Sequence, residues 1–318
     1  MPRTDMLSIK EGDNLVNVEE DDLPYVYKRV LGHGHTSWVE EVEDESTNKV
    51  FARKRIPIIR YRKEERAKVF RNEIAIIRGL DKHHHMIRVF ATYVTSKNFG
   101  LILQPVASDG DLHAYLATFK ELSDRESVTQ RPDARLEPMT TVLKRAFGCL
   151  TAGLAFMHDK KVRHKDIKPH NILVHDGRVI YTDFGYAFDF SGFTRSTTEG
   201  APNALTKRYS SPELLMHEPR NSKSDVFSLG CVLIEILATL IRDDVLEDAL
   251  NLGFASAVLD KIHHHLSRMQ HVICPAILIE ITKQMTERNA SKRIGSSQAA
   301  AALVQLPTFC CQQCAAYI

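Results

Sequence analysis

The sequence predicts an α+β protein of two lobes, in which a small sheet-rich lobe is followed by a larger helical lobe. A chain of 318 residues has room for one large domain or for two lobes around a cleft. Short β-type segments dominate residues 25–104, and apolar side chains after residue 104 recur mainly at helical spacing. The change of pattern predicts a connector between the lobes at residues 104–107.

The first lobe follows a polar beginning. Residues 1–24 contain an acidic run at 19–22 and no periodic apolar face, so they are predicted to form a flexible leader. An amphipathic helix is predicted at 63–78, where Phe70 and Ile77 share one stripe. Strands are predicted at 25–31, 38–43, 50–56, 87–94 and 99–104.

The second lobe is predicted to be mainly helical. Residues 226–241 are apolar nearly all round apart from Glu235, which favours a buried helix over a membrane span. Residues 120–138 are polar and contain two prolines, which predicts a surface loop between two helices. Residues 307–318 are expected to be a tail. A helix is predicted at 140–158, where the following side chains recur at a period of 3.6: Leu143, Ala146, Phe147, Leu150 and Leu154.

Composition excludes several classes of function. The chain is 43% hydrophobic and 26% charged, which is ordinary for a globular protein. Its formal net charge of +2 indicates neither nucleic-acid binding nor recruitment to a membrane surface. No apolar run follows the first basic residue, so no signal peptide is expected. No integral membrane segment is expected, because the longest apolar stretch, 226–241, is short and interrupted by Glu235. The six cysteines are therefore expected to be reduced thiols in the cytoplasm or nucleus.

Two polar motifs in the second lobe carry the strongest chemical signal. Residues 164–171 read His-Lys-Asp-Ile-Lys-Pro-His-Asn, and residues 183–185 read Asp-Phe-Gly. At this spacing they resemble the catalytic loop and metal-binding turn of eukaryotic-type protein kinases. Phosphoryl transfer needs a carboxylate aimed at the acceptor hydroxyl and oxygen ligands that hold Mg²⁺ against the ATP phosphates. By this resemblance, Asp166 takes the first role, and Asn171 and Asp183 are the metal ligands.

The resemblance extends to a glycine-rich loop and a strand lysine. Gly32 and Gly34 begin a segment similar to the loop that covers ATP phosphates, although Ser37 replaces the third glycine. Residues 51–54 read Phe-Ala-Arg-Lys and resemble the strand whose lysine, here Lys54, pairs the α- and β-phosphates. Strand alternation places Lys54 on the face opposite its arginine neighbours, which favours this role over that of an exposed strand lysine.

Further ATP-binding residues are implied by the resemblance alone. Glu73 is the expected ion partner of Lys54, with an exposed helix glutamate as the alternative. Pro105 lacks an N–H group, so the backbone donor to adenine is expected from Val106. The remaining expected contacts with the nucleotide are Val39 and Ala52 above the adenine, Leu173 below it, Leu103 at the gatekeeper position and Gln104 in the hinge.

The substrate side also follows the family pattern. Lys168 resembles the lysine with which serine/threonine kinases contact the transferred phosphate. An activation segment runs from Asp183 to Glu213, and Thr206 matches the hydroxyl that touches the catalytic aspartate and lysine in relatives. Arg293 resembles the arginine that, in the family, pairs with the glutamate at the end of the activation segment, here Glu213. Asp225 resembles the buried aspartate that supports the catalytic loop.

Some features depart from the family or invite other interpretations. Lys165 stands where the family has arginine, so a phosphate on Ser196, Thr197 or Thr198 is expected to find a weaker partner and to affect activity modestly. The histidine triplets at 83–85 and 263–265 are interpreted as solvated, because consecutive side chains diverge. The tail cysteines 310, 311 and 314 lack a fourth zinc ligand within the tail. Unmodified thiols are expected there, with S-acylation as the alternative.

These observations predict a serine/threonine protein kinase that uses ATP and Mg²⁺, acts on protein substrates and does not bind nucleic acid. The predicted kinase domain is 25–306, with the N-lobe at 25–103, the hinge at 104–107 and the C-lobe at 108–306. A pseudokinase, which keeps the fold as a nucleotide-binding or scaffold module, is the main alternative. A small-molecule kinase of related fold is disfavoured by the activation segment.

Overall fold

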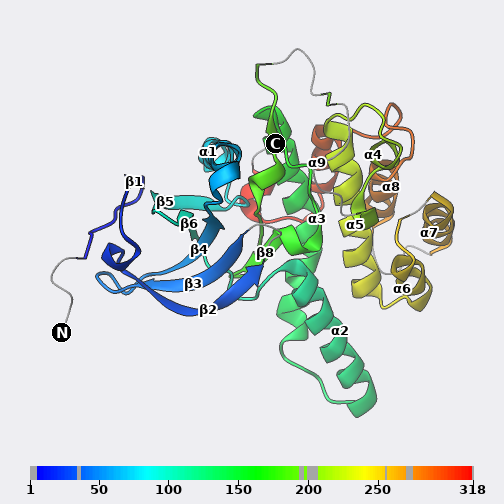
Figure 1. Ribbon diagram of the computed structural model, residues 1–318. Coiled ribbons are helices and arrows are strands. Elements are labelled where there is room, and N and C mark those ends of the chain that lie inside the picture. Colours follow the sequence, from blue (N-terminus) through cyan, green and yellow to red (C-terminus); the bar gives the residue numbers. More distant parts are fainter. Residues whose placement is uncertain are drawn as a thin grey trace. The chain divides into compact units, whose positions relative to one another are not determined.

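The computed structural model describes residues 6–33, 37–192, 197–198, 207–254, 256–269 and 275–316. The chain divides into an N-terminal unit, Met1–Gly110 with Asp183–Tyr186, and a C-terminal unit, Asp111–Thr182 with Ala187–Ile318. The N-terminal unit is built on a sheet and the C-terminal unit mainly on helices (Figure 1). The two-lobed α+β architecture predicted from the sequence is confirmed.

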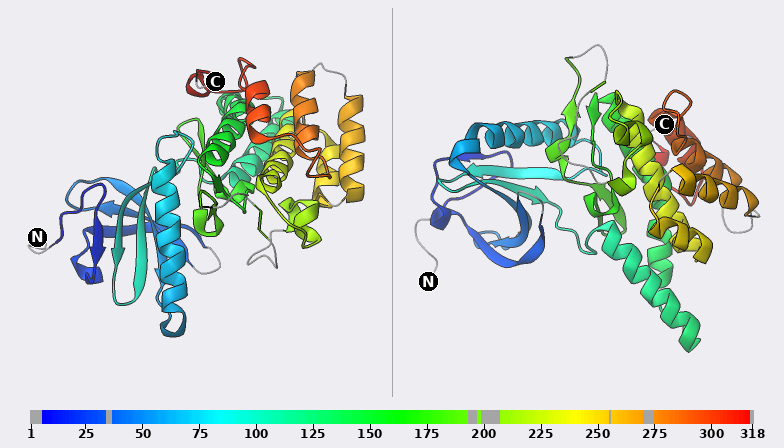
Figure 2. Two further views of the ribbon diagram at one scale, coloured as in Figure 1. Left: turned by 90° about the horizontal axis from the view of Figure 1, so that it is seen from above. Right: turned by 45° about the vertical axis from the view of Figure 1, so that its right-hand side comes forward.

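The N-terminal unit is a six-stranded sheet with one long helix on it. Strand β1 pairs in parallel with β5, and the other neighbours are antiparallel. Helix α1 (Lys63–Leu80) lies along one face of the sheet (Figure 2). The strands in spatial order are β1 (Asn14–Val16), β5 (Arg88–Val94), β6 (Asn98–Gln104), β4 (Val50–Pro57), β3 (Trp38–Asp44) and β2 (Tyr25–His33).

The prediction of a flexible leader is wrong for the part that the structure describes. Residues 6–24 contribute β1 and a short 3-10 helix, η1 (Glu20–Asp22). Ile9 and Leu23 are buried in a cluster that includes Phe51 and Phe90 of the sheet. Acidic and polar residues separate these few apolar ones, so no periodic pattern marked the segment. It covers the sheet face opposite α1.

This cover also explains why Arg53 of β4 is buried. Alternation places Arg53 on the face of β4 opposite Lys54, and its side chain is buried there as well. Its Nε donates to Glu40 Oε1 at 2.6 Å, and its NH1 lies 3.4 Å from Glu20 Oε1. Both faces of β4 are therefore covered, one by α1 and the other by the N-terminal segment.

The C-terminal unit is organised around the buried helix α5 (Ser222–Ile241). Helix α3 (Leu136–Asp159) packs against α5 and α9 (Ser296–Leu303), and α5 also packs against α8 (Ala276–Met285). Gly230 allows the α5–α8 contact, because a Cβ there would lie 2.7 Å from Thr286 Cγ2. Among the described helices, α5 is long and apolar enough to cross a membrane, but 72% of its apolar window is buried, as in a core helix.

Two small sheets and further helices complete the C-terminal unit. Strands β7 (Val162–Arg163) and β10 (Phe188–Asp189) form one small sheet, and β8 (Ile172–His175) and β9 (Arg178–Tyr181) form another. The further described helices are α2 (Leu112–Thr129), α4 (Pro212–Leu215), α6 (Asp244–Asn251), α7 (Ser256–Arg268) and α10 (Gln312–Ala315), with 3-10 helices η3 (Pro169–Asn171) and η5 (Lys207–Tyr209); η4 (Phe184–Tyr186) belongs to the N-terminal unit.

The predicted loop at 120–138 is mostly helical. Helix α2 continues to Thr129 and α3 begins at Leu136, so the connection covers residues 130–135. Most polar residues from 120 onward lie on the exposed side of α2, while Leu122 and Ser123 are buried. Pro138 lies in the first turn of α3, where a backbone N–H has no partner within the helix to lose.

Candidate active site

The N-terminal unit brings three predicted residues together around Lys54. Its Nζ lies 2.7 Å from Glu73 Oε1 and 2.8 Å from Asp183 Oδ1. Lys54 and Glu73 are both buried, so neither is the exposed residue of the alternative interpretation. Burial alone would lower the pKa of Lys54, but the adjacent carboxylates of Glu73 and Asp183 outweigh it and raise the pKa overall. The ammonium group is therefore fixed in its charged form.

Local structure explains why these side chains converge. Strand β4 points Ala52, Lys54 and Ile56 toward the face covered by α1, as alternation requires. On α1, Phe70, Glu73 and Ile77 are buried at helical spacing, so the carboxylate of Glu73 faces the same strand.

The glycine of the Asp-Phe-Gly motif lies beside two carboxylates. A Cβ on Gly185 would be in ordinary van der Waals contact with both, at 3.5 Å from Asp183 Oδ1 and 3.7 Å from Glu73 Oε2. Asp183 itself has a φ of 59°, in the left-handed region that aspartate tolerates better than most residues. The turn thus places a carboxylate beside Lys54 without crowding it.

The catalytic loop of the C-terminal unit forms a second convergent group. Lys168 Nζ lies 2.8 Å from Asp166 Oδ2. The Asn171 side-chain amide donates to the same oxygen at 2.9 Å and to the backbone carbonyl of Asp166 at 2.8 Å. Helix η3 carries Asn171 back toward Asp166 because Pro169 begins the turn. One carboxylate is therefore held by a cation and an amide from its own loop.

Asp225 at the start of α5 fixes the backbone of this loop. Its two carboxylate oxygens accept the N–H groups of His164 and Lys165 at 2.8 and 2.9 Å. Burial would raise the pKa of Asp225, but the hydrogen bond with His158 and the nearby positive charges lower it overall. A buried, ionised carboxylate thus holds the residues just before Asp166.

The end of the activation segment is clamped by a buried ion pair. Arg293 NH1 and NH2 donate to the two carboxylate oxygens of Glu213 at 2.8 and 3.0 Å. Ser224 Oγ adds a bond of 2.9 Å to Glu213. The structure therefore pairs the two residues that the family resemblance paired.

Other predicted residues have less defined positions. Gly34 and Thr206 lie outside the described residues, as does Ser196. Gly32 lies near the C-terminal end of β2, and a Cβ on it would have no atom within 4 Å. In the sheet, Val39 pairs with Lys54 and Ala52 with Leu103. Gln104 and Val106 follow in the N-terminal unit, whereas Leu173 is in β8 of the C-terminal unit.

Sequence reasoning missed Arg163. Its side chain is buried, its NH2 donates to Thr198 Oγ1 at 2.8 Å, and its NH1 donates to the Arg220 carbonyl at 2.8 Å. Thr198 and Arg220 also exchange two backbone hydrogen bonds. Lys165 had been identified as the basic group for a phosphate in this segment. A guanidinium group directly before His164 occupies that place instead, and the basic run 163–165 was the available signal.

A buried carboxylate on α5 was also missed. Glu235 Oε1 accepts hydrogen bonds from Arg208 NH2 at 2.8 Å and from the Tyr209 hydroxyl at 3.1 Å. These contacts tie the end of the activation segment to the core helix. The interruption of an apolar helix by one acidic residue was the available signal in the sequence.

Comparison with known proteins finds relatives among the serine/threonine-protein kinases. Serine/threonine-protein kinase H2 of Homo sapiens is 25% identical over 69% of this chain and 52% of its own length. Serine/threonine-protein kinase PKH3 of Saccharomyces cerevisiae is 28% identical over 67% of this chain and 24% of its own length. Serine/threonine-protein kinase Nek1 of Mus musculus is 29% identical over 67% of this chain and 16% of its own length. The chain thus spans about half or less of these curated relatives. The model of the protein kinase domain matches residues 25–304, so the chain belongs to the protein kinase family.

Proposed function

We propose that this chain is an active serine/threonine protein kinase that transfers the γ-phosphoryl group of Mg-ATP to hydroxyl groups of proteins. The contact set around Asp166 carries the proposal. A carboxylate that accepts bonds from Lys168 and Asn171 is fixed in direction, and such a carboxylate can accept the proton of an attacking hydroxyl. Relatives named as serine/threonine-protein kinases support the acceptor class.

Each charged group has a distinct role in this proposal. Asp166 orients the acceptor hydroxyl and takes its proton. The ammonium group of Lys168, held beside that carboxylate, stabilises the negative charge on the phosphoryl group in transfer. Lys54 binds the α- and β-phosphates, and Glu73 keeps its ammonium charged and in place.

Each unit also offers an oxygen donor of a kind that suits a magnesium ion. Asn171 uses its amide nitrogen on Asp166, which leaves its side-chain oxygen as the group for a cation. The side chain of Asp183 is 38% exposed, compared with 9% for Lys54, so its carboxylate is accessible. Oxygen ligands of these two kinds suit Mg²⁺. When bound, Mg²⁺ would neutralise charge on the ATP phosphates.

Replacing Asp166 by asparagine tests the proposal. Loss of a positioned general base lowers turnover by about 10²–10⁴-fold, so D166N should phosphorylate a degenerate peptide library that contains serine, threonine and tyrosine at least a hundredfold more slowly. Affinity for ATP, measured by calorimetry on both proteins, should change little because Asp166 acts on the acceptor. Unchanged phosphorylation by D166N would contradict the role of Asp166, and label on tyrosine would contradict the acceptor class.

The competing function is a pseudokinase that binds nucleotide or acts as a scaffold. Ser37 in the glycine-rich loop and Lys165 in the catalytic loop are the departures that favour it. The same calorimetry, combined with a turnover assay on the wild-type protein, separates the two functions. Binding of Mg-ATP without any transfer to peptide or protein would identify the pseudokinase.

A further inference from the structure

The C-terminal segment is packed against α3 and is not a loose tail. The backbone N–H of Gly148 donates to the Phe309 carbonyl at 2.8 Å, and the rings of Phe147 and Phe309 meet edge to face with centroids 5.9 Å apart. A Cβ on Gly148 would lie 2.6 Å from the Cβ of Cys310. This close approach puts the next residue of α3, Cys149, beside the cysteines of the segment.

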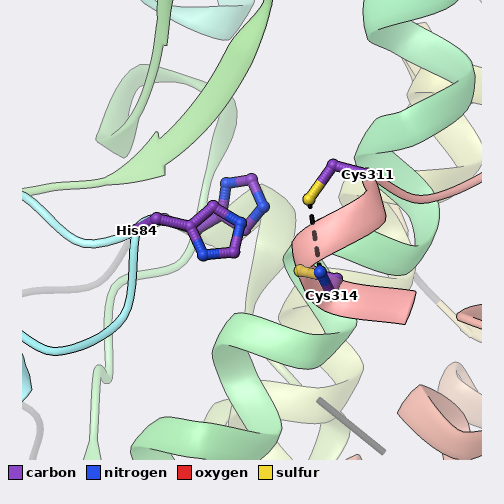
Figure 3. A group of neighbouring side chains, drawn as sticks. His84, Cys311 and Cys314 are labelled. Atoms are coloured by element: carbon purple, nitrogen blue, oxygen red, sulfur yellow. Dashed lines mark hydrogen bonds between the residues drawn. The ribbon is translucent and has the colours of Figure 1, made fainter. Parts of the chain in front are cut away.

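Three thiols meet at this contact. The backbone N–H of Cys311 points at Cys149 Sγ at 3.3 Å. The N–H of Cys314 points at Cys311 Sγ at 3.4 Å (Figure 3). The sulfur atoms of Cys311 and Cys314 lie within 4.8 Å of each other. The thiol of Cys149 interacts with both. Cys310 is different, because its Sγ donates to the Val304 carbonyl at 2.9 Å.

A metal ion would bind these cysteines as thiolates, because a coordinating thiol loses its proton.

We propose that Cys149, Cys311 and Cys314 bind a thiophilic metal ion, best matched by Zn²⁺, which fastens the C-terminal segment to α3. Three sulfur donors select soft or borderline metals such as zinc over Mg²⁺ or Ca²⁺. The spacing Cys311-x-x-Cys314 is a common chelating pair in zinc sites, and Cys149 supplies a third sulfur ligand from α3. The two N–H···S contacts are the kind of outer-shell support that orients metal-bound sulfur.

The fourth position of a tetrahedral zinc ion is not filled by these cysteines. A water molecule or a nitrogen or oxygen donor would occupy it. The site also predicts a pH response. Because bound thiolates must first lose their protons, zinc affinity should fall as the pH is lowered.

The test uses the full chain, purified with a phosphine reductant and freed of metal with a chelator. One Zn²⁺ per chain is expected by mass spectrometry of the refilled protein, and Zn²⁺ should raise the thermal midpoint because it binds the folded state. In competition with a chromogenic chelator, C149S, C311S and C314S should each bind Zn²⁺ at least about tenfold more weakly. C310S is the matched control, because a serine hydroxyl can still donate to Val304, and its affinity should stay at the wild-type value.

Substitution by Co²⁺ gives a second readout. Thiolate-to-cobalt charge-transfer bands are expected in the wild type and C310S and should weaken in C311S. Cys311 is only half-buried, so C311S remains informative even where C149S does not fold. X-ray absorption should count three sulfur neighbours around zinc and one lighter atom. Less than one zinc per chain at saturation, unchanged affinity in C311S, or a disulfide between two of the three cysteines in the purified reduced protein would each overturn the proposal.

Discussion

At the scale of single residues, the site depends on charges that are buried together. Glu73 has almost no exposure, so its carboxylate relies on Lys54 for compensation. Removing one partner of a buried ion pair leaves an uncompensated charge, which costs more than the pair contributes. The lysine of β4 is therefore expected to stabilise the fold in addition to its proposed role in phosphate binding.

We expect Lys54→Met to abolish phosphoryl transfer and also to destabilise the protein. The free energy of unfolding should fall by about 3–5 kcal/mol, because the carboxylate of Glu73 remains buried without its cation. The double variant K54M/E73M should recover most of this loss while staying inactive. Chemical denaturation of the three proteins checks this. Equal stability of K54M and wild type would show that solvent reaches Glu73.

At the scale of secondary-structure elements, strong periodicity was predictable and irregular packing was not. The strands and α1 appear close to their predicted bounds, because alternation and the 3.6-residue stripe are local properties. The N-terminal segment was missed because Ile9 and Leu23 are isolated apolar residues whose partners, Phe51 and Phe90, lie far along the chain. The second half of α2 was missed because an exposed helix face has the same polarity as a loop.

The N-terminal segment should therefore contribute to stability. Replacing the buried Leu23 by alanine leaves a cavity, and such changes cost about 2–5 kcal/mol. Val16 in the same segment is 64% exposed, and V16A should change stability by less than about 0.5 kcal/mol. Urea denaturation of L23A, V16A and wild type measures both. If L23A and V16A changed stability equally, the segment would not be packed on the sheet, and the prediction of a flexible leader would hold.

The candidate site was predictable to a similar degree. Residues 164–171 and 183–185 were found because their chemistry fixes residue types at short spacing. Arg163 and Cys149 were not found, since their partners Thr198 and Cys311 come from distant parts of the chain. Only tertiary structure brings such pairs together.

The ion pair that links the end of the activation segment to Arg293 should give an acid-sensitive contribution to stability. Burial acts to raise the pKa of Glu213, but the hydrogen bonds and charge of Arg293 outweigh it, so the folded pKa lies below the ordinary 4.5. A depressed carboxyl pKa stabilises the fold above the unfolded pKa, and this contribution is lost as the pH falls through the folded value.

We expect Glu213→Gln to be less stable than wild type at neutral pH, with the difference shrinking below a pH of about 4.5. Thermal midpoints of both proteins, measured from about pH 7 to about pH 3, follow the difference directly. Gln298 is a control on the same lobe because its Q298A change removes no ionisable group. A gap between E213Q and wild type that stays constant in acid would show that another group sets the response.

At the scale of the whole molecule, the proposed chemistry is divided between two units. Lys54, Glu73 and Asp183 belong to the N-terminal unit, and Asp166, Lys168 and Asn171 belong to the C-terminal unit. Each set is held by contacts within its own unit. Regulation can therefore act on one set without disturbing the fold of the other.

We expect Thr198 to be such a point of control in the C-terminal unit. The sequence suggested a modest effect of phosphorylation there, because lysine offers only a point charge. In the structure, the Arg163 guanidinium donates a hydrogen bond to Thr198 Oγ1, and Thr198 and Arg220 form an antiparallel backbone bridge. A phosphate on Thr198 would add a charge of about −1.5 to −2 next to this guanidinium group and would accept charge-assisted hydrogen bonds from it. The expected effect of phosphorylation is therefore larger than the sequence indicated.

We expect phosphate on Thr198 to raise both the activity and the thermal midpoint of the wild-type protein, and to have little effect in Arg163→Ala. The activity difference between phosphorylated and phosphatase-treated wild type should be at least about tenfold, or about 1.4 kcal/mol in activation free energy. Lys165→Ala is the matched control and should keep most of the effect, because the lysine is not the group bonded to Thr198. Mass spectrometry would verify the modified residue in each sample. An equal response to phosphate in wild type and R163A would mean that the Arg163 guanidinium group is not needed to bind the phosphate. The point charge of Lys165 would then be enough to bind it.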